Sequence, residues 1–186
     1  MILPVYAYGS PILKKVTEDI PPDYPGLEQL ITDMFDTMKV SDGVGLAAPQ
    51  IGVSARLFVI DARIYADEEP SLKDFRKVFI NPHILEQGGE EVLMQEGCLS
   101  VPNIHEDILR PEKIRIQYVD ENQVGHEEWY EGMAARIIQH EYDHLDGILF
   151  PDKLSPLKRR LLKGKLRDIT QGKISVRYKM VFPQKK

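Results

Sequence analysis

The segment 139–147, QHEYDHLDG, restricts this chain more than any other stretch, because it places two histidines four residues apart. Positions i and i+4 of a helix lie on one face, about one turn apart, so a helix here would let His140 and His144 reach a single metal ion. Glu141 would then lie beside the ion and handle protons for a metal-bound water, the arrangement known as HExxH. The alternative is an ordinary surface helix, and a third ligand would decide between the two.

The third ligand must come from upstream of this segment. A catalytic ion of this kind needs three protein ligands and one open position. No histidine or glutamate follows His144, and Asp146 lies too close on the same helix. The only cysteine, Cys98, lies in QEGCLSVP, and a thiolate is a strong ligand for divalent iron, zinc or nickel. A lone cysteine is commonly a small buried apolar residue, but beside an incomplete histidine pair we predict a Cys98, His140 and His144 site.

A third unusual stretch is GVGLAAPQIG, residues 43–52. Its glycines suit a turn leaving a helix, and Ala47 and Ala48 suit close packing. The amide of Gln50 has two open roles: a structural hydrogen bond, or a hydrogen bond to an oxyanion that develops during a reaction.

The apolar spacing predicts an α+β fold of mixed, mainly antiparallel sheets around a central helix that carries the HExxH motif. One amphipathic helix should run from Pro25 to Gly43, and the central one from Gly132 to Leu145, with Gly147 as its stop. Strand patterns cover 56–61, 77–82, 90–94 and 113–120, and 63–74 should form a loop.

The C-terminal part, residues 151–186, is predicted as a basic helix and strand that extend the same domain. Its helix should bury Leu154, Leu157, Leu161 and Leu162, and 174–182 should form the strand. The length of 186 residues favours a single catalytic domain, 1–186.

Charge is distributed unevenly along the chain. Residues 1–150 carry 12 Lys and Arg against 27 Asp and Glu, whereas residues 151–186 carry 12 against 2, a net charge of +10. Such a segment contacts a polyanion, of which RNA is the commonest in the cytoplasm, or it is simply a solvated helix face. No apolar run is long enough for a membrane span, and a single cysteine suits a reducing compartment, so we expect a cytoplasmic protein with no membrane partner and no DNA partner.

Taken together, GVGLAAPQ, EGCLS and QHEYDHLDG, in this order, resemble the three signature motifs of the peptide deformylases, and YGSPILKK resembles the start of that family. The resemblance implies a hydrolase that removes the N-formyl group from the initiator methionine of nascent polypeptides and releases formate. It also implies one divalent ion per chain, Fe²⁺ in the cell, with Zn²⁺, Ni²⁺ or Co²⁺ as substitutes. No signature motif covers the basic tail; its net charge of +10 separately suggests the hypothesis that it docks the enzyme near the ribosomal exit tunnel.

The resemblance also assigns roles to residues. Glu141 would act as general base and then as general acid, while the Gln50 amide and the Leu99 N–H would stabilise the oxyanion. The methionine side chain and the peptide backbone would be bound by Val44, Gly45, Met94, Gly97, Met133 and Ile137. One departure is His105, which stands where many deformylases carry an arginine, and we expect nearby Arg110 to compensate.

Two other functions fit parts of the pattern. A metallopeptidase that cuts ordinary amide bonds would use the same chemistry, but its usual downstream ligand is missing. An RNA-binding protein with a structural zinc would fit the basic tail, but a closed structural site needs a fourth ligand that the sequence does not offer.

Overall fold

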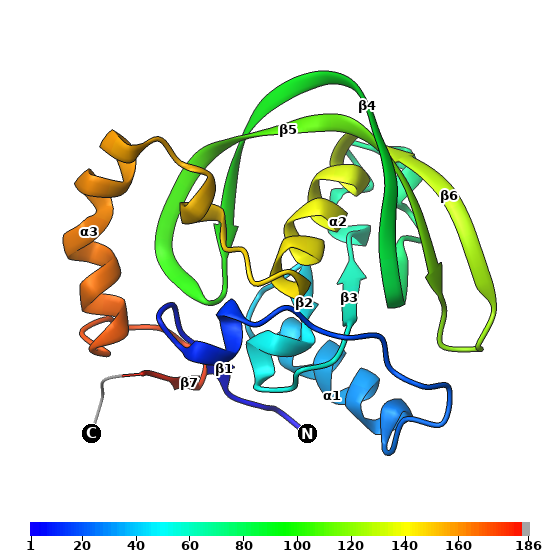
Figure 1. The fold of residues 1–186 in the computed structure, drawn as a ribbon, viewed down its shortest axis with the longest axis horizontal. Coiled ribbons are helices and arrows are strands. Elements are labelled where there is room, and N and C mark those ends of the chain that lie inside the picture. Colours follow the sequence, from blue (N-terminus) through cyan, green and yellow to red (C-terminus); the bar gives the residue numbers. More distant parts are fainter. Residues whose placement is uncertain (184–186) are drawn as a thin grey trace.

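Helix α2 (Gly132–Leu145) is the central element of the computed structural model, which describes residues 1–183 (Figure 1). The prediction of this helix is confirmed at both ends. The Glu69 carboxylate, from the loop before β4, accepts a hydrogen bond of 3.0 Å from the Met133 N–H and so satisfies one free donor at the start of the helix. Gly147, with φ of +73°, turns the chain away from its end.

A five-stranded antiparallel sheet curves around this helix in the order β2-β3-β4-β5-β6. Its strands are β2 (Gly45–Ala47), β3 (Leu57–Asp61), β4 (Arg76–Cys98), β5 (Val101–Val119) and β6 (Gly125–Glu131). In Figure 1 the long β4–β5 hairpin arches over α2. The α+β class with mainly antiparallel sheets is therefore confirmed. The strands expected at 77–82 and 90–94 are two parts of the single strand β4. The sequence pattern divides it because bulges shift the register between the two parts and interrupt the alternation of apolar residues.

The β4–β5 hairpin ends in a two-residue tip. Cys98 and Val101 pair across the hairpin, which leaves Leu99 and Ser100 as the turn. A bulge between Glu96 and Cys98 leaves Gly97 without a partner on β5. Cys98 is thus the last residue of β4 and directly precedes this turn.

Helix α1 (Leu27–Val40) covers the β2–β3 side of the sheet, where Met34 and Met38 are buried against Leu46. Gly26, in the left-handed conformation, precedes the first helical residue, so Pro25 lies outside the helix rather than in its first turn. The helix ends at Val40, three residues before Gly43, although the Gly43 N–H still donates to the Met38 carbonyl at 2.9 Å.

Helix α3 (Pro156–Thr170) and the strand β7 (Met180–Val181) form the C-terminal part, and β7 pairs in parallel with β1 (Val5–Tyr6). Leu154 and Leu162 are buried as expected, but the expected burial of Leu157 and Leu161 is wrong, because they are 66% and 74% exposed. The side chains that pack inward from α3 are spaced by four and three residues and are Leu162, Leu166 and Ile169.

The final strand is shorter than the predicted 174–182, and residues 184–186 of the predicted extension lie outside the described residues. No helix within residues 1–183 is long and apolar enough to cross a membrane.

Candidate metal centre and substrate cleft

Three side chains predicted as ligands meet between the hairpin tip and α2. One ligand atom from each of Cys98, His140 and His144 lies within 4.8 Å of the other two. The Cys98 Sγ is 3.5 Å from the His144 Nε2. The helix brings the two imidazoles together by its repeat, whereas Cys98 arrives from β4 through the fold. Among residues 1–183 this is the group of histidine, cysteine and carboxylate side chains whose geometry can hold an ion.

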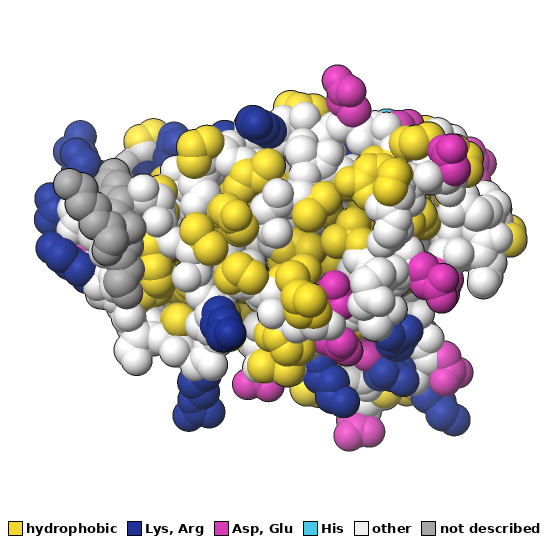
Figure 2. All heavy atoms as spheres, turned by 90° about the horizontal axis from the view of Figure 1, so that it is seen from below, with side chains coloured by type: hydrophobic (Ala, Val, Ile, Leu, Met, Phe, Trp, Pro, Cys, Tyr) yellow, Lys and Arg dark blue, Asp and Glu magenta, His cyan; other side chains and the backbone are white. Residues whose placement is uncertain are grey.

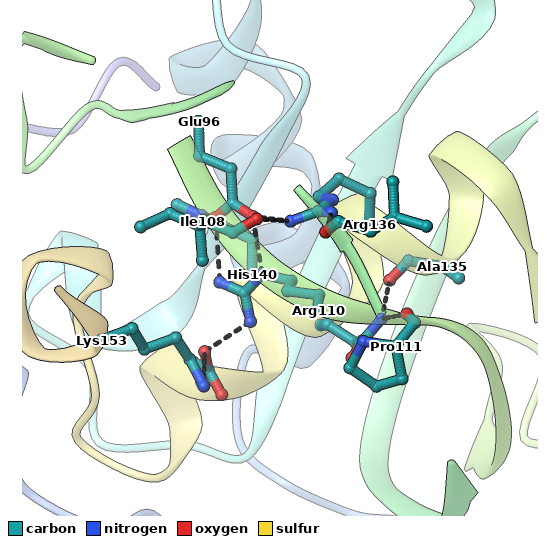
Figure 3. Close-up of polar contacts among 11 residues, drawn as sticks. Glu96, Ile108, Arg110, Pro111, Ala135, Arg136, His140 and Lys153 are labelled. Carbon is teal, nitrogen blue, oxygen red and sulfur yellow. Dashed lines mark hydrogen bonds and ion pairs between the residues drawn. The ribbon is translucent and has the colours of Figure 1, made fainter. Parts of the chain in front are cut away.

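Glu96 orients the first histidine and belongs to a buried charge network (Figure 3). Its carboxylate accepts a hydrogen bond of 2.8 Å from the His140 Nδ1, two from Arg110 at 2.6 and 2.9 Å, and one from Arg136 at 2.8 Å. Burial alone would favour the neutral acid, but these donors hold the pKa of Glu96 well below its usual range. A carboxylate on Nδ1 leaves the Nε2 of His140 free for an ion.

The electrostatics around the histidines favour a bound cation. Burial lowers the pKa of His140, but Cys98 and Glu96 outweigh it and raise that pKa well above the ordinary value. Burial and the neighbouring His140 lower the pKa of His144, so its imidazole stays neutral, the form that ligates a metal. One sulfur and two imidazole nitrogens form a donor set that suits Fe²⁺, Zn²⁺, Ni²⁺ or Co²⁺.

Glu141 is buried beside this centre, and its Oε2 has no hydrogen-bond partner among the described residues. Burial raises the pKa of Glu141 to about 7, with a smaller contribution from Glu96. A Cβ atom built on Gly45 would lie 2.5 Å from the Glu141 Oε1, so the carboxylate packs directly against that glycine. The pKa of this carboxyl is therefore suited to the exchange of protons near neutral pH.

Gln50 lies on a 3-10 turn (Ala48–Ile51) and is buried against the hairpin tip. Its Oε1 accepts a hydrogen bond of 2.9 Å from the Ala47 N–H, which fixes the orientation of the amide. Its Nε2 donates to the Ser100 Oγ at 3.2 Å and is 3.5 Å from the Cys98 Sγ. The amide N–H group is thus held beside the candidate metal centre, and the structural role and the oxyanion role are both compatible with this position.

A cavity of about 730 Å³ opens beside these residues. Gly43 and Gly45 both have an ordinary φ, and the glycines are needed there for space, because Leu99 and Glu141 approach them closely. The predicted site residues that line the cavity are Val44, Gly45, Gln50, Met94, Gly97, Cys98, Leu99, Met133, Ile137, His140 and Glu141.

The two residues named in connection with the missing arginine have different outcomes. His105, expected to be a surface residue and not a ligand, is exposed, lines the cavity and lies with its ring over Gly97. Arg110 was expected to compensate for the missing arginine, and this expectation is wrong, because Arg110 is buried and bonded to Glu96 and Asp143, away from the cavity lining.

The sequence reasoning missed Glu96, Arg136 and the segment 175–178, which also lines the cavity. Glu96 could have been found from its place two residues before Cys98. The segment 175–178 carries no local signal, because only the fold brings it to the cavity.

The fold and the site define a class of protein: a curved antiparallel sheet around an HExxH helix, with a cysteine from a hairpin tip beside the two histidines. This arrangement is suited to metal-assisted hydrolysis. The model of the family "Polypeptide deformylase" matches residues 2–160. The chain belongs to the polypeptide deformylase family, whose members remove the N-formyl group from nascent peptides, and it is an enzyme of this class.

Individual relatives are similar to this chain over nearly its whole length. The peptide deformylase of Christiangramia forsetii is 56% identical, with 100% of this chain and 98% of the relative covered. That of Flavobacterium johnsoniae is 48% identical, with 98% and 96% covered. Among solved structures, the enzyme of Legionella pneumophila superposes with a TM-score of 0.81 at 39% identity, covering 93% of this chain and 98% of that one.

Proposed function

We propose that Cys98, His140 and His144 hold one divalent metal ion and that the chain hydrolyses the formamide bond of N-formylmethionyl peptides at this centre, releasing formate. The observation that carries the proposal is the meeting of the three ligand atoms within 4.8 Å beside the buried Glu141, at the wall of a cavity. A bound ion would polarise the formyl carbonyl and lower the pKa of a coordinated water. Fe²⁺ is the ion we expect in the cell, and Zn²⁺, Ni²⁺ or Co²⁺ would substitute for it.

The protein residues supply the proton transfers and the oxyanion contacts. Glu141, whose pKa burial raises to about 7, accepts a proton from the attacking water and later delivers it to the leaving amine. The Gln50 amide and the Leu99 N–H donate to the oxyanion, and loss of one such donor commonly lowers the rate by about 10²–10³-fold.

The cavity provides binding for both parts of the substrate. Half-buried Met94 and Met133, with Ile137, offer an adaptable apolar surface for the unbranched methionine side chain. Gly97 has no partner across the hairpin, so its backbone groups can pair with an extended peptide, with Val44 and Gly45 on the other side. Pairing through the backbone tolerates many sequences, as an enzyme that acts on many nascent chains requires.

Two variants test the proposal. Glu141→Ala should keep the metal and lose turnover, while Cys98→Ala should lose the metal. The substrate pair is formyl-Met-Ala-Ser and its acetylated counterpart, with metal content measured on anaerobically purified protein. Undiminished formate release by Glu141→Ala would refute the assigned base, and cleavage of internal peptide bonds without formate release would indicate a metallopeptidase instead.

We further propose that α3 docks the enzyme on ribosomal RNA, in the cytoplasm, where its nascent substrates emerge. Figure 2 shows several Lys and Arg side chains and little Asp or Glu at the end of the molecule where Figure 1 places α3, whereas toward the other end Asp and Glu are mixed with further Lys and Arg. Removal of 151–186 would also remove Leu162, Leu166 and Ile169, which cover Val101, Ile104 and Ile108 in the core, so reversal of exposed charges is the better test. Arg160→Glu with Lys163→Glu should weaken salt-sensitive co-sedimentation with ribosomes, and unchanged binding would contradict this docking.

A further inference from the structure

The chain returns to the candidate site after α3. Residues 175–178 line the cavity together with Cys98, Leu99 and His140. The family model matches only residues 2–160, so this wall lies outside the part of the chain that defines the family. The segment can therefore give the cavity a property of its own.

Several contacts hold this segment against the hairpin tip. The Tyr178 hydroxyl donates a hydrogen bond of 2.8 Å to the Leu99 carbonyl. The Asn103 side chain donates to the Ser175 carbonyl at 3.4 Å, and β7, which follows the segment, pairs with β1. The wall is thus tied at both of its ends.

Arg177 is the charged residue of this wall. Its side chain is exposed and makes no hydrogen bond or ion pair with any residue in 1–183. Elsewhere along the cavity, Glu96 and Arg136 are buried and paired with each other, and exposed Asp42 lies between α1 and β2. A peptide that extends along the 175–178 wall would therefore meet an unpaired positive charge.

We propose that residues 175–178 form a wall of the substrate cleft and that Arg177 is a specificity-determining residue, which favours peptides with an acidic side chain downstream of the formylmethionine. This inference rests on the proposed function. An exposed guanidinium and carboxylate pair should change kcat/KM by about two- to fivefold, and salt should reduce the preference.

The test is a competition among formylated peptide amides. Glu, Gln or Lys replaces the second, third or fourth residue of formyl-Met-Ala-Ala-Ser-amide, and mass spectrometry follows the loss of the formyl group from each. The wild type should prefer Glu over Lys at one of these positions, Arg177→Ala should lose the preference, and Arg177→Glu should reverse it. Lys173→Glu is the matched control, because Lys173 is exposed, lies four residues earlier and is outside the cavity lining. It should retain the wild-type preference.

An equal Glu-to-Lys ratio for the wild type and Arg177→Glu at all three positions would overturn the role of Arg177. The uncharged Gln peptides measure deformylation in the same samples. Absence of formate release from every peptide would therefore count against the proposed function instead. Tyr178→Phe tests the wall itself. It should speed trypsin cleavage after Arg177 and reduce the preference for Glu, and no change in either would overturn the anchoring by Tyr178.

Discussion

Gly45→Ala should displace the proposed base without removing any catalytic group. A Cβ at this position would lie 2.5 Å from the Oε1 of Glu141 and 2.8 Å from its Cγ and Cδ, where ordinary contacts begin at 3.4 Å, so the carboxylate must move by about 0.9 Å. A displacement of about 1 Å commonly costs about 10²-fold in rate, so kcat should fall by about 10- to 100-fold. The overpacking should also destabilise the protein by about 1–3 kcal/mol.

The assay is formate release under saturating metal, with thermal unfolding measured on the same samples. Gly125→Ala is the control, because a Cβ there would meet nothing within 4 Å. The double variant Gly45→Ala with Glu141→Ala isolates the cause. If the added methyl acts through Glu141, the double variant should be as active and as stable as Glu141→Ala alone. Losses that simply add, or a Gly45→Ala enzyme within threefold of wild-type activity, would refute the reasoning.

Three more outcomes are expected. Glu96→Gln should lower metal affinity by about 10- to 100-fold in chelator competition, whereas Glu86→Gln, in an exposed ion pair, should leave it unchanged. In the metal-free protein the pKa of Glu141 is about 7 against an ordinary 4.5, so the unfolded state loses its proton first and stability falls as pH rises through this window. Glu141→Gln should therefore gain stability over wild type, on the order of 3 kcal/mol above pH 7 and none below pH 4.5; in urea unfolding with EDTA, a gap independent of pH would contradict this. We propose that residues 1–186 form one domain, which should unfold in a single transition. Leu166→Ala, at a buried position, should lower the free energy of unfolding by about 2–5 kcal/mol, while Leu161→Ala, at an exposed position, should have little effect. Two separate unfolding transitions would contradict the single domain.

The parts of the fold that could be predicted are those fixed by local periodicity. The apolar spacing along α2 predicted both ends of the helix, because the 3.6-residue repeat and the stop at Gly147 lie within one short segment. The continuity of β4 could not be read, because bulges interrupt the alternation. The predicted burial of Leu157 and Leu161 was wrong because the packing partner of a helix decides which of its faces is buried. In α3 the buried face carries Leu162 and Leu166.

The candidate site shows the same division. Cys98, His140 and His144 could be singled out because few residue types bind a transition metal, and the fold brings them together. Arg110 could not be placed, because whether an arginine faces a cavity or a buried carboxylate depends on strands that meet through the fold. The wall at 175–178 was missed for a related reason, since its position depends on the pairing of β7 with β1.

The pairing of Val5 with Met180 joins segments from opposite ends of the described chain beside the hairpin tip. Contacts between such distant residues close a long loop, so they form late in folding and contribute nothing until the intervening chain is ordered. Short terminal strands also belong to the regions that open at the lowest free energy. Mild denaturant should therefore loosen the 175–178 wall while α2 and the sheet are still intact, and the proposed preference for acidic peptides should disappear before the circular dichroism of the helices changes.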